Sequence, residues 1–303
     1  MSKDEFLLIL VVIVLIIFSL AAYKNKNFIS FPSVTSPVTI QSSNSSRTSI
    51  KKETTIQEKI ETISEGIAEL QEAQESSVFK DMIMISSVSG ASSTDPKREY
   101  ITLTANKNNK NPIDITGWKL INTTGKSIIV GTAVETYQPG SYRNTASHVV
   151  LKPGDKAIIA TGGSPILYSF RINKCLGYFT EDVTFIPSMK TSCPAPRDEG
   201  FYLAPTSLEN DECMEYIQTL SSCRRPYRNN YNDLSQACRS FLSKNINYNG
   251  CFYKHSSDSD FYENEWRLFA GRNKSLWKDS REEIKLLDTI GKTVSKYRIS
   301  YSY

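Results

Sequence analysis

Six cysteines are the residues of this chain best suited to covalent chemistry, and all of them lie between positions 175 and 251. They are Cys175, Cys193, Cys213, Cys223, Cys238 and Cys251. No Cys-x-x-Cys pair is present, although structural zinc sites usually take two ligands from one such tight turn. The even number and the clustering instead favour three disulfides, which persist in oxidising compartments outside the cytoplasm.

The pairing of these cysteines is predicted from the helical spacing around them. Apolar residues recur at helical intervals over 211–223 and again over 232–242, which predicts two short antiparallel helices. Two disulfides would join such a hairpin, one near its turn and one at its open end. The pairs predicted in this way are Cys223–Cys238, Cys213–Cys251 and, by remainder, Cys175–Cys193.

Residues for acid–base or metal chemistry are scarce. The only histidines are His148 and His255, and the chain carries no nucleophile elbow, P-loop, dinucleotide fingerprint or His-Glu-x-x-His motif. Four acids alternate near the end of the cysteine-rich stretch: Asp258, Asp260, Glu263 and Glu265. Calcium binds alternating carboxylates, but the EF-hand spacing is absent. We therefore predict a protein that is not an enzyme and that has no cofactor or metal.

A group of arginines and two tryptophans form the predicted binding face: Arg224, Arg225, Arg228, Trp266 and Trp277. Arginine and aromatic side chains are enriched where proteins recognise partners, so an envelope protein or a glycan is the expected ligand class. The alternative is that the arginines are solvated and the tryptophans pack the cysteine-rich stretch onto its neighbours. A formal net charge of +4 over 303 residues does not favour nucleic acid as a partner.

The elements that position this chemistry begin with an uncharged apolar segment, FLLILVVIVLIIFSLAA, at 6–22. Its length and composition predict one transmembrane helix at 6–23, preceded by a cytoplasmic tip at 1–5. A cleaved signal peptide is the alternative, because Ser19 and Ala21 supply small residues for cleavage. Since the disulfides require an oxidising compartment, we predict a single-pass protein of the cell membrane with its bulk outside the cytoplasm.

A Ser/Thr-rich linker is predicted at 24–50, followed by a short helix or coiled coil at 51–78. Apolar residues alternate there at spacings of four and three, as in the heptad pattern: Ile56, Ile60, Ile63, Ile67 and Leu70. A homo-oligomer through residues 56–70 is one interpretation of this stripe. The other is a single amphipathic helix that rests on the domain that follows.

From residue 82 the pattern changes to alternating, β-branched strands separated by polar turns. Strands are predicted at 82–88, 98–105, 114–123, 127–130, 148–151, 156–161, 283–287 and 294–301. Short strands at this spacing indicate an all-β sandwich, with Trp118 in its core.

Four runs in this region resemble the lamin-tail domain in sequence and in order: EYITL at 99–103, IDITGWKL at 113–120, LKPGD at 151–155 and IKLLDTIGKTV at 284–294. The resemblance covers about 80–165 and 265–303. It implies an immunoglobulin-like β-sandwich in a binding or tethering protein. This chain departs from the pattern because the cysteine-rich stretch interrupts it. We thus expect a first part at 79–165, an insertion at 166–265 and closing strands at 266–303.

These patterns together predict a mainly β protein. Its immunoglobulin-like sandwich carries a disulfide-rich helical insertion and follows a transmembrane helix and a short coiled coil. The predicted function is binding or adhesion at the cell envelope, with the ligand left open. One alternative is an extracytoplasmic hydrolase with acidic residues of the insertion at its site, since carboxylates distant in sequence can meet in a fold. Another is a structural coiled-coil oligomer.

Overall fold

The structure is a computed structural model that describes residues 48–139, 144–190, 192–200, 208–227, 231–278 and 280–300. The described part consists mainly of β-sheets, with several helices and three disulfides. The predicted transmembrane segment at 6–23 and most of the predicted linker lie outside these residues. Among the helices that are described, none combines the length and the apolar character needed to cross a membrane.

The chain divides into two compact units inside its first described helix, α2 (Thr48–Glu75), between Ser64 and Glu65. This helix confirms the one predicted at 51–78. All the sheets and all the cysteines belong to the second unit.

A seven-stranded sheet forms the larger layer, and its strands lie in the following order. They are β1 (Ile83–Ser89), β2 (Tyr100–Ala105), β9 (Lys156–Ala160), β11 (Tyr262–Phe269), β10 (Phe170–Asn173), β6 (Ala133–Val134) and β7 (Ala146–Ser147). Strands β9 and β11 run parallel, whereas β1, β2 and β9 form an antiparallel series. Strands β10 and β11 were not predicted: β10 lies inside the stretch assigned to the insertion, and β11 crosses the boundary predicted at 265.

The second layer is a four-stranded antiparallel sheet. Its order is β13 (Thr293–Ile299), β12 (Glu282–Leu287), β4 (Lys119–Asn122) and β5 (Ser127–Ile129). A separate pair joins β3 (Ile113–Asp114) to β8 (Val150–Leu151). The strand predicted at 114–123 is therefore two strands. Gly117 divides them, because its φ of 82° turns the chain in a conformation that favours glycine.

The main core lies between the two larger sheets and draws alternate residues from each. Ile101 and Leu103 of β2 and Ile284 and Leu286 of β12 are all 0% exposed. Trp118, 2% exposed, lies in the same core, which confirms the packing role predicted for it. Period-two alternation thus places one face of each strand in the core, and the opposite face is left for solvent or a ligand.

One buried carboxylate anchors the crossover that carries the chain from β11 to β12. Glu99, 0% exposed, accepts hydrogen bonds from the backbone N–H groups of Leu276 and Trp277, at 2.8 and 2.7 Å. Glu282 accepts a third from Lys278 N at 2.6 Å. Charge-assisted bonds of this kind are roughly twice as strong as neutral ones, so the crossover is held firmly against the sandwich of sheets.

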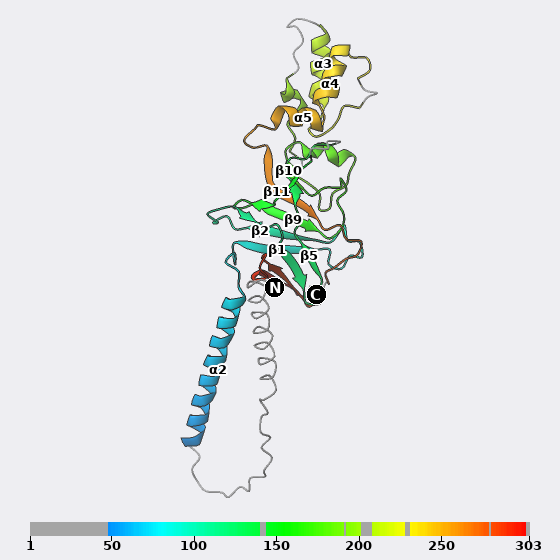
Figure 1. Ribbon diagram of the computed structural model, residues 1–303. Helices are drawn as coiled ribbons and strands as arrows, with labels where there is room; N and C mark the ends of the chain where they lie inside the picture. Colours follow the sequence, from blue (N-terminus) through cyan, green and yellow to red (C-terminus); the bar gives the residue numbers. More distant parts are fainter. Residues whose placement is uncertain are drawn as a thin grey trace, which may run out of the picture. The chain divides into compact units, whose positions relative to one another are not determined.

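The cysteine-rich module, residues 174–261, contains three helices and two short 3₁₀ segments among its described residues. These are η2 (Leu176–Glu181), η3 (Pro196–Glu199), α3 (Leu208–Thr219), α4 (Gln236–Asn245) and α5 (Tyr248–His255). The helices α3, α4 and α5 lie together beyond the ends of β10 and β11 (Figure 1). Two of them confirm the helices predicted at 211–223 and 232–242, with shifted ends. The third, α5, was not predicted.

All six cysteines are paired, as predicted, but the predicted pairing is wrong at every bridge. The disulfides are Cys175–Cys251, Cys193–Cys223 and Cys213–Cys238. The prediction treated the module as a two-helix hairpin. The additional helix α5 instead returns the chain to the base of the module, where Cys251 meets the cysteine that precedes η2. Bridge Cys213–Cys238 then joins α3 to α4 within a small apolar core of their own.

Candidate binding groove on the four-stranded sheet

The outward face of the four-stranded sheet carries the best candidate site. Along β12 the inward residues are at most 1% exposed, while Glu283, Lys285 and Leu287 point away from the core and are half-buried. On β4, Ile121 does the same. Register brings these side chains together, because Ile121 lies directly opposite Lys285 across the two strands. An open surface of alternating charged and apolar side chains results.

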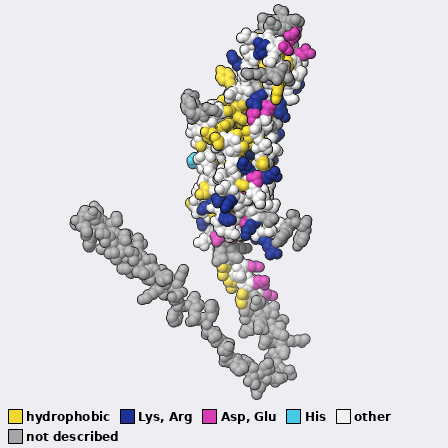
Figure 2. Space-filling view, turned by 90° about the vertical axis from the view of Figure 1, so that its right-hand side faces the viewer, with side chains coloured by type: hydrophobic (Ala, Val, Ile, Leu, Met, Phe, Trp, Pro, Cys, Tyr) yellow, Lys and Arg dark blue, Asp and Glu magenta, His cyan; other side chains and the backbone are white. Residues whose placement is uncertain are grey.

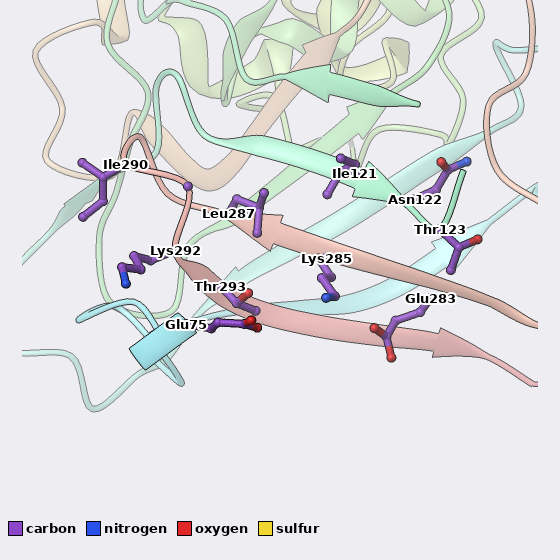
Figure 3. Close-up of a pocket in the computed structure, with 11 residues that line it drawn as sticks. Glu75, Ile121, Asn122, Thr123, Glu283, Lys285, Leu287, Ile290, Lys292 and Thr293 are labelled. Atoms are coloured by element: carbon purple, nitrogen blue, oxygen red, sulfur yellow. The ribbon is translucent and has the colours of Figure 1, made fainter. Parts of the chain in front are cut away.

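A groove of about 630 Å³ runs over this face. Its lining comes from the end of α2, from β4 and the turn after it, and from β12 and β13 with their connecting turn. The lining residues are Glu75, Ile121, Asn122, Thr123, Glu283, Lys285, Leu287, Ile290, Gly291, Lys292 and Thr293. Figure 3 shows Lys285 near the middle of the groove, between Leu287 and Glu283 of the same strand.

The turn between β12 and β13 forms one end of the groove and is held in a fixed shape. Asp288, only 6% exposed, accepts hydrogen bonds from the backbone N–H groups of Ile290 and Lys292 at 3.0 and 2.9 Å. Gly291 has a φ of 82°, which this turn requires. The consequence is that Ile290 is presented to solvent at 79% exposure, as an apolar side chain at the rim.

The central electrostatic feature is a pair of lysines on adjacent strands. Lys285 of β12 lies directly opposite Lys296 of β13. Like charges in this position destabilise a sheet, and within the described residues neither lysine forms an ion pair. By contrast, Glu283 is held by Arg298 at 3.1 Å. The cations therefore remain available to a ligand, while one of the two carboxylates of the groove is already neutralised.

The lysine side of the groove is extended by Lys119 on β4. It lies opposite Leu287 and, among the described residues, it has no ion-pair partner. Three ammonium groups without an ion-pair partner in the described part of the chain thus occupy the same face of three neighbouring strands. Apolar contact is offered beside them by Ile121 and Leu287. The arrangement suits a ligand that carries negative charges together with alkyl groups.

The residues predicted as a binding face lie in different surroundings. Trp266 and Trp277 are 2% and 3% exposed and lie in the main core, so they are not available to a ligand on the surface. Arg225 is neutralised by Glu181 at 2.8 Å and by Asp182 at 2.6 Å. Arg224 also faces Glu181, at 3.7 Å, and Arg228 lies outside the described residues.

The acids of the cysteine-rich module are likewise engaged by cations. Lys174 Nζ lies 3.1 Å from Asp258 and 2.5 Å from Asp260. The hydrogen bond from Lys174 lowers the pKa of Asp260. For Asp258, the hydrogen bond from His255 is the largest cause of a lowered pKa, followed by that from Lys174. These contacts favour a structural role for both acids.

The remaining acids of this group have partners of their own. Glu265 accepts a hydrogen bond from Arg267 at 2.6 Å, and Glu263 accepts one from Ser192 at 2.7 Å. Across the described residues, no group of three or more His, Cys, Asp or Glu side chains is placed to hold a metal ion. The groove is thus the site whose charged groups are least satisfied by the protein itself.

Sequence reasoning missed the groove because it searched for clusters along the chain. Lysines 119, 285 and 296 lie on one face of the sheet, where Lys285 lines the groove and the other two lie beside it, and only strand pairing brings the first of them beside the others. In the sequence, each of these lysines is a polar residue in an alternating strand pattern. Every strand with one face in solvent shows such residues, so the pattern does not single out a binding site. Compared with known proteins, the chain matches no protein family and no curated protein.

Proposed function

We propose that this chain is a binding protein of the cell envelope that uses the groove to hold an acidic segment of another protein. A membrane helix at 6–23 anchors it, and the remainder lies outside the cytoplasm. The two larger sheets form an immunoglobulin-like sandwich of the lamin-tail type. The proposal assigns no catalytic step to the chain.

The observation that carries the proposal is the pairing of Lys285 with Lys296 across β12 and β13. A fold gains nothing from this repulsion, so its presence on a grooved face points to a ligand that supplies negative charge. The three disulfides support an extracytoplasmic location, because such bonds do not persist in a reducing cytoplasm. The apolar lining favours a protein segment over a glycan, since sugars are usually stacked on aromatic rings and the groove has none.

The test uses the full chain with its disulfides formed, in detergent, and two polyanions as probes. Poly-L-glutamate represents an acidic protein segment, and polygalacturonate represents an acidic glycan. We expect poly-L-glutamate to bind the more tightly of the two, and its affinity to fall as salt rises, because exposed charges are screened. Tighter binding of polygalacturonate would show that the ligand class is wrong.

Two reversals of charge, at Lys285 in the groove and at Lys296 on the neighbouring strand, test binding and stability together. Lys285→Glu should weaken binding of poly-L-glutamate about tenfold, equivalent to about 1.4 kcal/mol. Lys296→Glu should weaken it similarly, yet raise the free energy of unfolding by about 0.5 kcal/mol, since it places opposite charges across the strands. Lys107→Glu, on an exposed turn that does not line the groove, is the matched control. Unchanged binding in both Lys285→Glu and Lys296→Glu would refute the assignment of the site.

A further inference from the structure

Helix α2 carries a stripe of large apolar side chains that the protein leaves uncovered. Ile60, Ile63, Ile67 and Leu70 are 54%, 62%, 52% and 73% exposed. Figure 2 shows apolar side chains along one side of the described part of this helix and acidic side chains along the other. Stripes of this kind mark contact surfaces, because soluble proteins rarely leave contiguous apolar area in water.

The spacing of the stripe identifies what kind of partner it fits. Its residues fall at positions a (Ile60, Ile67) and d (Ile63, Leu70) of a heptad repeat, and Ile56 continues the d positions toward the N-terminus. A strict a and d repeat of this kind is the seam of a coiled coil, in which each side chain inserts between four residues of a facing helix. The partner is thus another helix with the same repeat.

The positions that flank the seam indicate that this partner is a second copy of the chain. Five of the six flanking e and g positions carry no charge: Gln57, Ser64, Gly66, Gln71 and Ala73, with Lys59 as the exception. A helix of opposite charge would gain nothing from such flanks. Identical copies meet there without repulsion, because the glutamates fall at the outer b, c and f positions: Glu58, Glu61, Glu65, Glu69, Glu72 and Glu75.

The identity of the seam residues sets the number of copies. Leucine at d with isoleucine at a favours two strands, whereas isoleucine at both positions favours three or four. Here isoleucine occupies both a positions and, at Ile56 and Ile63, two of the three d positions. The small residues Gly66 and Ala73 at g also allow the close approach that a wider bundle needs. From this we infer that α2 assembles three copies of the chain into a parallel coiled coil.

The parallel arrangement follows from symmetry, since three identical helices close into a ring only when all point the same way. Only two to three heptads are available, and isolated helices of that length are marginal. Anchoring in one membrane would raise the effective concentration of the three helices. The inference is independent of the ligand of the groove, although a trimer would present three grooves together.

The mass of the full, oxidised chain in detergent tests this, measured by light scattering with the detergent contribution subtracted. We expect three times the chain mass of 34.2 kDa. Ile63→Asp should reduce the mass to that of one chain, because the aspartates of the three copies would be buried together at one layer of the seam. Glu65→Gln, at an outer f position on the same helix, should leave the mass unchanged and serves as the matched control.

A second variant tests the number of copies without disrupting the seam. Replacing Ile56 and Ile63 by leucine makes every d position leucine, and the mass should fall from three chains to two. A single-chain or two-chain mass for the unaltered protein would overturn the inference. So would a three-chain mass that Ile63→Asp leaves intact, since assembly would then depend on another surface. Helix content by circular dichroism and a non-reducing gel confirm that each variant is folded.

Discussion

Removing the bridge between Cys175 and Cys251 should destabilise the second unit more than removing any other disulfide. This bridge joins residues 76 apart, at the base of the cysteine-rich module, whereas Cys213–Cys238 joins residues 25 apart. By the loop-entropy relation, a disulfide that closes the longer loop, with no other bridge inside it, stabilises the fold by about 4.5 kcal/mol. One that closes the shorter loop stabilises it by about 3.5 kcal/mol. The other two bridges lie inside the longer loop and shorten it, which reduces its contribution to about 4 kcal/mol.

Lost packing adds to the cost of removing this bridge. Cys175 and Cys251 are 0% and 1% exposed, in a core rich in aromatic rings, so alanine at both positions also leaves a cavity. We expect Cys175→Ala/Cys251→Ala to lose at least about 4 kcal/mol in urea unfolding without reductant. Cys213→Ala/Cys238→Ala, confined to the small core of α3 and α4, should lose less. A larger loss from the second pair would refute the reasoning from loop length.

A single substitution tests the connectivity itself. In Cys175→Ala the unpaired thiol should be Cys251, which peptide mapping after alkylation of the denatured chain without reductant identifies. The hairpin pairing inferred from sequence would instead leave Cys193 unpaired. Alkylation at Cys193 alone would therefore show that the observed bridges are wrong.

Two further outcomes are expected. Gly177→Ala should destabilise the module by about 3 kcal/mol, because its Cβ would clash with Cys223 Sγ and lie 2.7 Å from Cys193 Sγ. Gly163→Ala, with nothing within 4 Å, is the control in the same urea titration, and equal losses would contradict the packing argument. Acid should weaken the contacts of Lys174 with Asp258 and Asp260, whose pKa values are lowered in the folded protein. The stability that these contacts give is complete above about pH 5 and is lost as pH falls below about 4. Lys174→Met should reduce that loss, and an unchanged acid transition would remove the role assigned to this lysine.

Local patterns were sufficient for most of the elements. Alternation along 283–287 and 294–301 predicted β12 and β13, because a strand between core and solvent repeats every two residues. Apolar residues at spacings of three and four in 51–78 predicted α2, because such spacing places them on one face of a helix. Strand β10 escaped notice because all four of its residues are buried, which leaves no alternation to detect.

The candidate site depended on register, which no local pattern contains. Trp266 and Trp277 seemed suited to recognition by residue type, but the neighbouring strand and the crossover held by Glu99 enclose them. Conversely, Lys285 was unremarkable in sequence until strand pairing placed Lys296 opposite it. Residue type shows what a side chain can do, whereas its neighbours decide whether it is free to do it.

By itself, the sequence determined the β-rich class, the disulfide chemistry and the heptad stripe, since each depends on residues close together along the chain. The three-dimensional packing alone decided which cysteines meet, which aromatic residues are buried and where the unpaired lysines gather. These features depend on contacts between residues as far apart as Lys119 and Leu287. Long-range contacts are selected by the burial of the whole core, so they are settled only when all the layers assemble.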